Sequence, residues 1–116
     1  MEAIGQGMSN KKEIRKKFRD VCLKRDNLTC RMCGLKAKSF EDAEELFDVH
    51  HINDRSLMPH GGYVLENGIT LCEADHIKAE EFHSTGTSHP GYAPDDLYKV
   101  INSTLEKAIE ASEKLG

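Results

Sequence analysis

The sequence predicts a small α+β domain in which two short strands are flanked by helices at both ends of the chain. Apolar residues recur at three- and four-residue spacing within residues 11–25 and 95–114, which is the period of a helix packing one face on a core. Residues 47–52 alternate in polarity and residues 67–72 form a short apolar run, as strands do. Cysteines at metal-ligand spacing indicate that a bound ion reinforces this fold.

The length of the chain limits it to one domain. Its 116 residues are enough for one core but not for two independent ones. Residues 1–10 are small and polar and include two glycines, so we expect a flexible N-terminus followed by a single domain over residues 11–116. Only 38% of the residues are hydrophobic and 31% are charged, so the core must be thin.

The first predicted helix runs from about Lys11 to Arg25 and ends near Asp26. Basic side chains cover most of its surface, while one stripe is apolar. The stripe consists of Ile14, Phe18, Val21 and Cys22. Because Cys22 has no partner at CxxC spacing, it is interpreted as a small buried hydrophobic residue.

The middle of the chain contains the two predicted strands. Residues 39–46 fit either a short helix or a loop, and residues 47–52 alternate well enough to form a strand. A loop with Pro and Gly follows. The dipeptide Asn67-Gly68 is interpreted as a turn signal at the entry of the second strand, residues 67–72.

Two helices are predicted after the strands. The first covers residues 75–82, which contain good helix formers, and residues 84–94 form a loop rich in Ser, Thr, Gly and Pro. A single C-terminal helix is predicted over about residues 95–114, opened by Pro94. Its apolar face consists of Leu97, Val100, Ile101, Leu105 and Ile109.

The charge of the chain is strongly asymmetric although its net value is only −4. Residues 1–40 carry eleven basic and four acidic side chains, whereas residues 41–116 carry five basic and sixteen acidic ones. The densest basic cluster is either a solvated helix face or a surface for a nucleic-acid backbone, since such binding depends on the local patch and not on the average charge. The cluster contains Lys11, Lys12, Arg15, Lys16, Lys17 and Arg19.

Membrane-spanning and secreted proteins are not expected from this sequence. The chain has no run of about 18 apolar residues, which a membrane-spanning helix requires. Its N-terminus lacks the basic start and the apolar stretch of a signal peptide. We therefore expect a cytoplasmic protein with no membrane partner, in which four cysteines are metal ligands or thiols rather than disulfides.

The cysteines predict a structural zinc site. Cys30-x-x-Cys33 places two thiolates on one tight turn, and Cys72-x-x-Asp75 repeats the same gap later in the chain. Zinc binds cysteine sulfur, histidine nitrogen and carboxylate oxygen in tetrahedral sites, so we predict that these four residues hold Zn2+ and tie two distant segments together. Two alternatives remain open: Asp75 caps a helix without binding metal, or His76 is the fourth ligand.

Three histidines and an asparagine form the second candidate site. His50 and His51 are adjacent on a predicted strand, so their side chains point to opposite faces of the sheet. Asn67 lies at the start of the second strand, and His76 follows nine residues later on the predicted helix. A hairpin folded against this helix can bring His50 and His76 around one cation and leave His51 free to face a substrate.

In this order, the motifs resemble an HNH endonuclease of the zinc-bracketed type found in phages and restriction systems. The resemblance covers about residues 25–83 and rests on Cys30-x-x-Cys33-Gly34, Val49-His50-His51-Ile52, Gly61-Gly62, Asn67-Gly-Ile-Thr-Leu-Cys72 and Asp75-His76. It implies a ββα-metal fold, also called a His-Me finger, in which two antiparallel strands and a helix clasp a divalent ion. One departure is the aspartate at position 75, where zinc-binding members usually have cysteine, because carboxylate binds zinc less tightly than thiolate.

The resemblance implies a role for each residue of the histidine site. His51 matches the general base, and an ordinary histidine pKa of about 6.5 suits it to accept a proton from water near neutral pH. Asn67 matches the asparagine that ties backbone groups across the loop and keeps His51 aimed. His50 and His76 match the two protein ligands of a divalent ion, Mg2+, Mn2+ or Ni2+, placed on the scissile phosphate.

Further contacts follow from the same resemblance. Some family members supply an additional metal ligand one helical turn after the last histidine; that position is Glu80 here, while His83 lies two turns on, and either can approach the ion. The basic cluster on residues 11–19 would follow the phosphate backbone. Arg31 and Arg55 lie near the motif and are predicted to contact phosphates as well.

The implied function is hydrolysis of DNA phosphodiester bonds to a 5′ phosphate and a 3′ hydroxyl, with one site nicking one strand. Besides DNA, a terminase is an expected partner, because similar short HNH proteins are encoded beside phage packaging genes. A phage-encoded protein would lie in the host cytoplasm. We expect a monomer or a weak dimer. The alternative is a non-catalytic, zinc-stabilised nucleic-acid-binding module, which Asp75 favours and the intact His51 disfavours. A purely structural zinc adaptor would explain the acidic C-terminal half but not the paired histidines.

Overall fold

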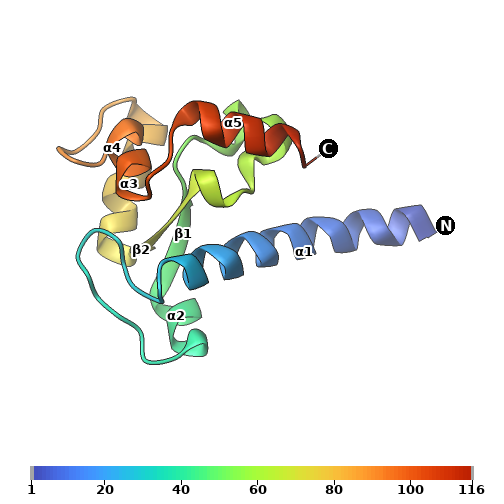
Figure 1. Ribbon diagram of the computed structural model, residues 1–116, viewed down its shortest axis with the longest axis horizontal. Helices are drawn as coiled ribbons and strands as arrows, with labels where there is room; N and C mark the ends of the chain where they lie inside the picture. The colour runs from blue at the N-terminus through green and yellow to red at the C-terminus, as the bar shows by residue number, and fades with distance from the viewer. Residues whose placement is uncertain (1, 116) are drawn as a thin grey trace.

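The computed structural model describes residues 2–115, with side chains from Lys11 onward. A two-stranded antiparallel sheet is surrounded by helices, which confirms the α+β class (Figure 1). The helices and strands are α1 (Glu2–Arg25), α2 (Phe40–Leu46), β1 (Phe47–His51), β2 (Gly68–Cys72), α3 (Glu73–Thr85), α4 (Pro94–Val100) and α5 (Leu105–Glu113). Three short 3-10 turns in the loop between the strands are Arg55–Leu57, Pro59–Gly62 and Leu65–Asn67.

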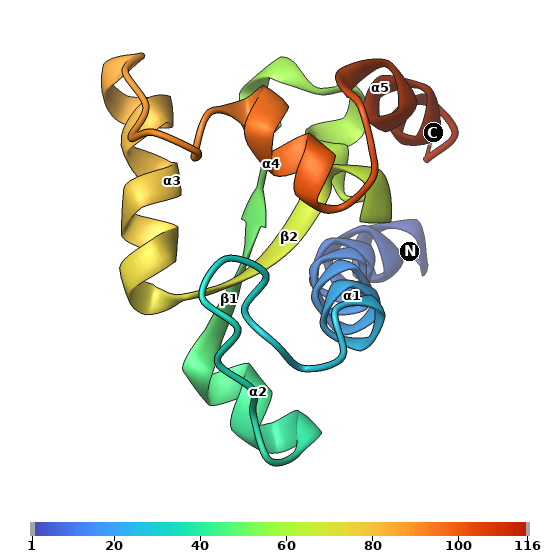
Figure 2. The ribbon, with the colours of Figure 1, turned by 60° about the vertical axis from the view of Figure 1, so that its left-hand side comes forward.

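The β1–β2 hairpin lies between α3 on one side and α1 on the other (Figure 2). Its register places Phe47 opposite Cys72 and His51 opposite Gly68. At Gly68, α1 approaches so closely that a Cβ atom would lie 2.6 Å from the sulfur of Cys22. The φ angle of Gly68 is −123°, which any residue can adopt. The glycine is therefore needed for packing space, and not for turn geometry as the sequence predicted.

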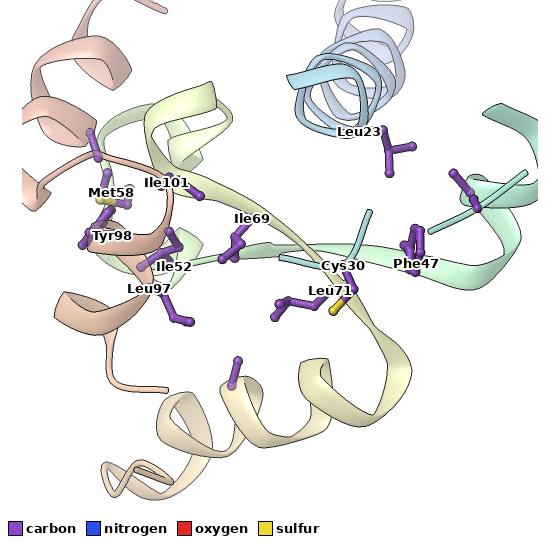
Figure 3. Close-up of a cluster of buried hydrophobic side chains, with 14 residues drawn as sticks. Leu23, Cys30, Phe47, Ile52, Met58, Ile69, Leu71, Leu97, Tyr98 and Ile101 are labelled. Atoms are coloured by element: carbon purple, nitrogen blue, oxygen red, sulfur yellow. The ribbon is translucent and has the colours of Figure 1, made fainter. Parts of the chain in front are cut away.

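The core consists of apolar side chains from the hairpin, the end of α1 and α4. Ile52, Ile69 and Leu71 are completely buried, and Leu97 of α4 is 1% exposed. Figure 3 shows Ile52 and Leu97 close together where α4 meets the hairpin. Cys30 belongs to the same buried cluster, so the predicted zinc site adjoins the core directly.

The buried carboxylate of Asp26 joins the end of α1 to β2. It accepts hydrogen bonds from Arg25 Nε at 2.7 Å, from Arg31 Nη1 at 2.6 Å and from the backbone nitrogen of Thr70 at 3.0 Å. Arg31 also donates to the carbonyl oxygen of Val100 at 2.7 Å. These contacts give Arg31 a cross-linking role, and its predicted phosphate contact stays a prediction.

We expect Asp26→Asn to lower the free energy of unfolding at pH 7 by about 2 kcal/mol. This loss is smaller than the loss from breaking a fully buried ion pair, because the arginines stay partly exposed. Burial alone would raise the pKa of Asp26, but Arg25, Arg31 and the Thr70 amide outweigh it and lower the pKa. The stabilisation is therefore present above the unfolded-state pKa of about 3.9 and is lost as the pH falls through the folded-state value. Urea denaturation should show a smaller difference between wild type and variant at pH 3 than at pH 7; an equal difference contradicts this.

The bounds of two helices differ from the sequence prediction, and one ambiguous segment is helical. α3 spans Glu73–Thr85 rather than residues 75–82. α1 begins at Glu2 rather than near Lys11, so residues 2–10 belong to a helix. Their flexibility stays a prediction. Met1 lies outside the described residues. The ambiguous residues 39–46 form α2, whose N-cap Ser39 accepts a hydrogen bond from the backbone of Asp42 at 3.1 Å.

The C-terminal segment forms two helices, and the prediction of one helix over residues 95–114 was wrong. α4 ends at Val100, and Asn102 adopts a left-handed conformation with a φ of 59°. Thr104 then caps α5 by accepting a hydrogen bond from the backbone nitrogen of Lys107 at 3.1 Å. Asparagine tolerates the left-handed region and threonine is a favourable N-cap, so these two residues stop one helix and start the next.

Candidate functional site

A cleft of about 440 Å³ lies between α1 and α3, along β1. Three of the histidines in the HNH-like motif line it, although those of β1 point to opposite faces of the hairpin. The lining residues are Arg15, Phe18 and Arg19 of α1, Val49, His50 and His51 of β1, Asp54, Arg55 and Tyr63 of the loop, and His76, Glu80 and His83 of α3.

On the α3 side of the hairpin, two histidines converge on one carboxylate oxygen. His50 Nδ1 and His76 Nε2 each lie 3.1 Å from Glu80 Oε2. The two imidazole rings are 5.2 Å apart between centroids. The other ring nitrogen of His76 lies 3.1 Å from Asp48 Oδ2, so the ring is held with Nε2 toward Glu80. The structure thus brings together the two histidines that the sequence paired.

His83 is also close to this group but makes a different contact. Its Nε2 donates a hydrogen bond to the backbone carbonyl oxygen of His51 at 2.9 Å, and its ring stacks on His50 with centroids 4.9 Å apart. Ligand atoms of His50, Glu80 and His83 lie within 4.8 Å of one another. His50 and Glu80 thus have two candidate third partners: His83, whose ligand atom lies within 4.8 Å of both, and His76, whose Nε2 lies 3.1 Å from Glu80 Oε2.

The histidine and carboxylate donors fit a divalent cation. Burial, aided by the neighbouring His83 and His76, lowers the pKa of His50 to about 3. The ring is consequently neutral at pH 7 and keeps a nitrogen lone pair for a cation. Imidazole nitrogen combined with carboxylate oxygen suits Mn2+, Ni2+ and Zn2+, while a mainly oxygen environment would suit Mg2+ better.

On the α1 side of the hairpin, His51 is enclosed by two aromatic rings. Phe18 stacks on its imidazole with centroids 4.5 Å apart, and Tyr63 meets it at 89° with centroids 4.9 Å apart. Its Nε2 is buried without a hydrogen-bond partner among the described residues, which leaves Nδ1 as the nitrogen able to act on solvent. Burial, aided by the charge of Arg55, lowers the pKa of His51 to about 4, below the ordinary value assumed from the sequence.

Asn67 ties the loop between the strands together. Its Oδ1 accepts hydrogen bonds from the backbone nitrogen of Asn53 at 3.0 Å and from the hydroxyl of Tyr98 at 2.6 Å. Its Nδ2 donates to the carbonyl oxygens of Asn53 at 3.1 Å and of Gly62 at 3.3 Å. Asn67 does not line the cleft, and these contacts bridge the loop that follows His51.

The three cysteines and the aspartate of the predicted zinc site meet in one cluster. Asp75 Oδ2 lies 3.2 Å from the sulfurs of both Cys30 and Cys72, and the sulfurs of Cys33 and Cys72 are 3.8 Å apart. All four ligand atoms lie within 4.8 Å of one another. A tetrahedral zinc with Zn–S bonds of about 2.3 Å requires sulfurs roughly 3.8 Å apart, so the cluster can hold Zn2+.

Comparison with known families identifies the segment that carries both clusters. Residues 30–82 match a family model described as HNH endonuclease. These residues form an HNH domain. No curated protein and no solved structure matches the chain. HNH domains are nuclease-type domains that act on nucleic acid with divalent metal ions. Separately, no helix in the described residues is long and apolar enough to cross a membrane.

The geometry of the HNH domain distinguishes the alternatives for Asp75. The N-cap of α3 is Cys72, and no side chain caps this helix. Asp75 instead points into the cysteine cluster, where the hydroxyl of Tyr92 donates a hydrogen bond to its Oδ1 at 2.6 Å. The ring of His76 is directed to Glu80 on the other side, as described above. Asp75 is therefore the better placed fourth ligand, and Tyr92 is a supporting residue that the sequence did not reveal.

The predicted DNA-binding residues occupy different places relative to the HNH domain. Arg15, Arg19 and Arg55 line the cleft, whereas Lys12, Lys16 and Lys17 do not. Arg19 is partly committed elsewhere, because its Nη2 donates to the carbonyl oxygen of Phe47 at 2.7 Å and to that of Glu44. Lys16 pairs with Asp20 at 2.8 Å. Lys11 lines a second hollow beside the cleft.

Proposed function

We propose that this HNH domain is a metal-dependent endonuclease that hydrolyses DNA phosphodiester bonds and nicks one strand in each event. The observation that carries the proposal is the composition of the cleft. His51 and the group of His50, His76 and Glu80 line the same cleft as Arg15 and Arg55, which form no ion pair with a described carboxylate. A proton acceptor, a cation site and groups that attract phosphate thus lie together.

The cation is assigned to His50, His76 and Glu80. The contact of Asp48 with His76 supports this choice, since a carboxylate on the far nitrogen commonly orients a histidine toward a metal. When bound, a divalent ion supplies Lewis-acid stabilisation of the negative charge that develops on the phosphate. Mn2+ and Ni2+ should serve better than Mg2+ because two of the three donors are imidazoles.

His51 is assigned the role of general base. A water molecule attacks phosphorus as His51 takes its proton, the bond to the 3′ oxygen breaks, and the products are a 5′ phosphate and a 3′ hydroxyl after that oxygen gains a proton from solvent. The neutral imidazole required for this step is the form present at pH 7. The negative charge of a bound phosphate raises the pKa of the ring from about 4, which makes it a stronger base when substrate is present.

His83 is assigned to positioning, because its hydrogen bond fixes the backbone of His51. We expect His76→Gln to weaken Mn2+ binding by at least about tenfold. His83→Gln retains an N–H donor for the carbonyl oxygen of His51, so Mn2+ affinity should change less than about threefold. Calorimetric titration of Mn2+ without DNA measures both variants. Equal losses in the two variants would show that His83 is a ligand.

The proposed activity is tested by incubating supercoiled plasmid with the protein and added Mn2+, Ni2+ or Mg2+, and with EDTA as a control. Conversion to the open circle before any linear product, fastest with Mn2+ or Ni2+ and absent with EDTA, supports the proposal. Stable binding without conversion favours the non-catalytic nucleic-acid-binding module. The terminase partner, the cytoplasmic location, the phage origin and the monomer or weak dimer stay predictions.

A further inference from the structure

A second hollow lies along α1 beside the cleft. This hollow measures about 350 Å³ and is lined by Lys11, Ile14, Arg15, His60, Tyr63 and Leu115. It shares Arg15 and Tyr63 with the cleft that contains the histidines. Lys11 and Arg15 are one helical turn apart, about 6 Å along the axis of α1. The two hollows thus adjoin each other at Arg15 and Tyr63, and basic groups line both of them.

Tyr63 stands at the junction of the two hollows and is held by arginines. Arg55 Nη1 donates a hydrogen bond to the hydroxyl of Tyr63 at 3.0 Å. Arg15 lines both hollows together with Tyr63. Burial alone would raise the pKa of Tyr63, but Arg55 and Arg15 outweigh it and lower the pKa. The ring of Tyr63 also meets Phe18 at 89° with centroids 5.7 Å apart. Tyr63 therefore lies between the general base and a pair of cations.

The arginines at this junction differ from the other arginines of the described chain. Arg25 and Arg31 are paired with Asp26, and Arg19 donates to backbone carbonyl oxygens. Arg15 and Arg55 are exposed, and neither is paired with a described carboxylate within 4.0 Å. Among the residues whose side chains the structure describes, no acidic one lines the second hollow. Two guanidinium groups without a described carboxylate partner, together with the Tyr63 hydroxyl, form a donor set suited to a phosphate, which arginine binds through several N–H groups.

We propose that Arg15, Tyr63 and Arg55 form a binding subsite for a phosphate of the substrate strand next to the scissile one, and that the strand continues through the second hollow along α1 toward Lys11. This inference rests on the proposed endonuclease function and adds the path of the substrate to it. Phosphate contacts of this kind fix the register of a strand on a protein without reading its sequence. The subsite would accordingly set where the scissile phosphate stops beside His51.

The subsite is tested by the salt dependence of DNA binding, measured by fluorescence anisotropy of a short labelled duplex with zinc-loaded protein and no catalytic ion added. Arg15→Ala and Arg55→Ala should each reduce the slope of log K against log salt concentration by about 0.9, the value of one lost phosphate contact. Lys99→Ala is the matched control, because this lysine is exposed on α4 and lines neither hollow. If the arginine variants reduce the slope no more than Lys99→Ala, the subsite is wrong.

Tyr63→Phe separates a phosphate contact from support of the His51 ring. The variant keeps the aromatic ring but loses the hydroxyl, so we expect weaker DNA binding and a raised KM with an unchanged kcat. Unchanged binding would remove Tyr63 from the subsite. The proposed activity and the subsite fail separately. If the wild type never nicks plasmid but the arginine variants reduce the salt slope of DNA binding, the subsite is supported and the activity is not. If the wild type nicks plasmid and the arginine variants leave the salt slope unchanged, the activity is supported and the subsite is not.

Discussion

Replacing His51 with alanine is expected to reduce plasmid nicking by about 10²- to 10⁴-fold, the usual contribution of a general base. His51 is the histidine of the cleft whose ring lies on the α1 side of the hairpin, away from Glu80. Its Nε2 is buried without a hydrogen-bond partner among the described residues, so Nδ1 is the nitrogen available to a water molecule. Initial rates of open-circle formation with saturating Mn2+ measure the loss.

The interpretation of this variant requires that fold and cation site survive. Alanine at position 51 removes a contact with Phe18 but none with His50, His76 or Glu80, so the Mn2+ affinity should stay within about threefold of wild type. The circular dichroism spectrum should also be unchanged. Nicking that persists in a folded, Mn2+-binding His51→Ala protein would exclude His51 as the base and would assign the reaction to another group.

The sequence predicted the parts of the site whose chemistry depends on local spacing. Adjacent histidines on a strand must face opposite sides, and the structure places His50 against α3 and His51 against α1. Two-residue gaps between ligands place Cys30 with Cys33, and Cys72 with Asp75, on single turns. The two half-sites meet because the segment after α1 packs beside β2, as the predicted zinc site requires.

The remaining parts of the site depend on contacts between distant segments, for which one sequence contains no local signal. Phe18 looked like any apolar residue of a helical stripe, yet it covers the imidazole of His51. Asp48, Tyr63 and Tyr92 belong to no spacing pattern and act through side chains brought close by folding. The depressed pKa of His51 has the same origin, because burial is a property of the folded chain.

Loss of the zinc site is expected to have the largest effect on stability. Structural zinc binding contributes about 10–16 kcal/mol in small zinc domains, comparable with the whole stability of about 5–15 kcal/mol of a typical domain. Cys30 is 1% exposed and belongs to the core, so its sulfur links the ligand cluster to the packing of the hairpin. Cys30→Ser should therefore lose zinc and show no cooperative thermal unfolding transition.

A matched substitution distinguishes loss of zinc from loss of a buried cysteine. Cys22 is also completely buried but lies outside the cluster, so Cys22→Ser should keep one zinc per chain while losing some packing. Asp75→Cys should bind zinc more tightly than wild type, because thiolate is the softer ligand, although it removes the acceptor for Tyr92. Metal content by mass spectrometry and thermal unfolding with and without chelator measure all three variants. Full zinc content in Cys30→Ser would contradict the four-ligand site. If only Cys22→Ser and Asp75→Cys retain zinc, the cluster binds the metal that stabilises the thin core.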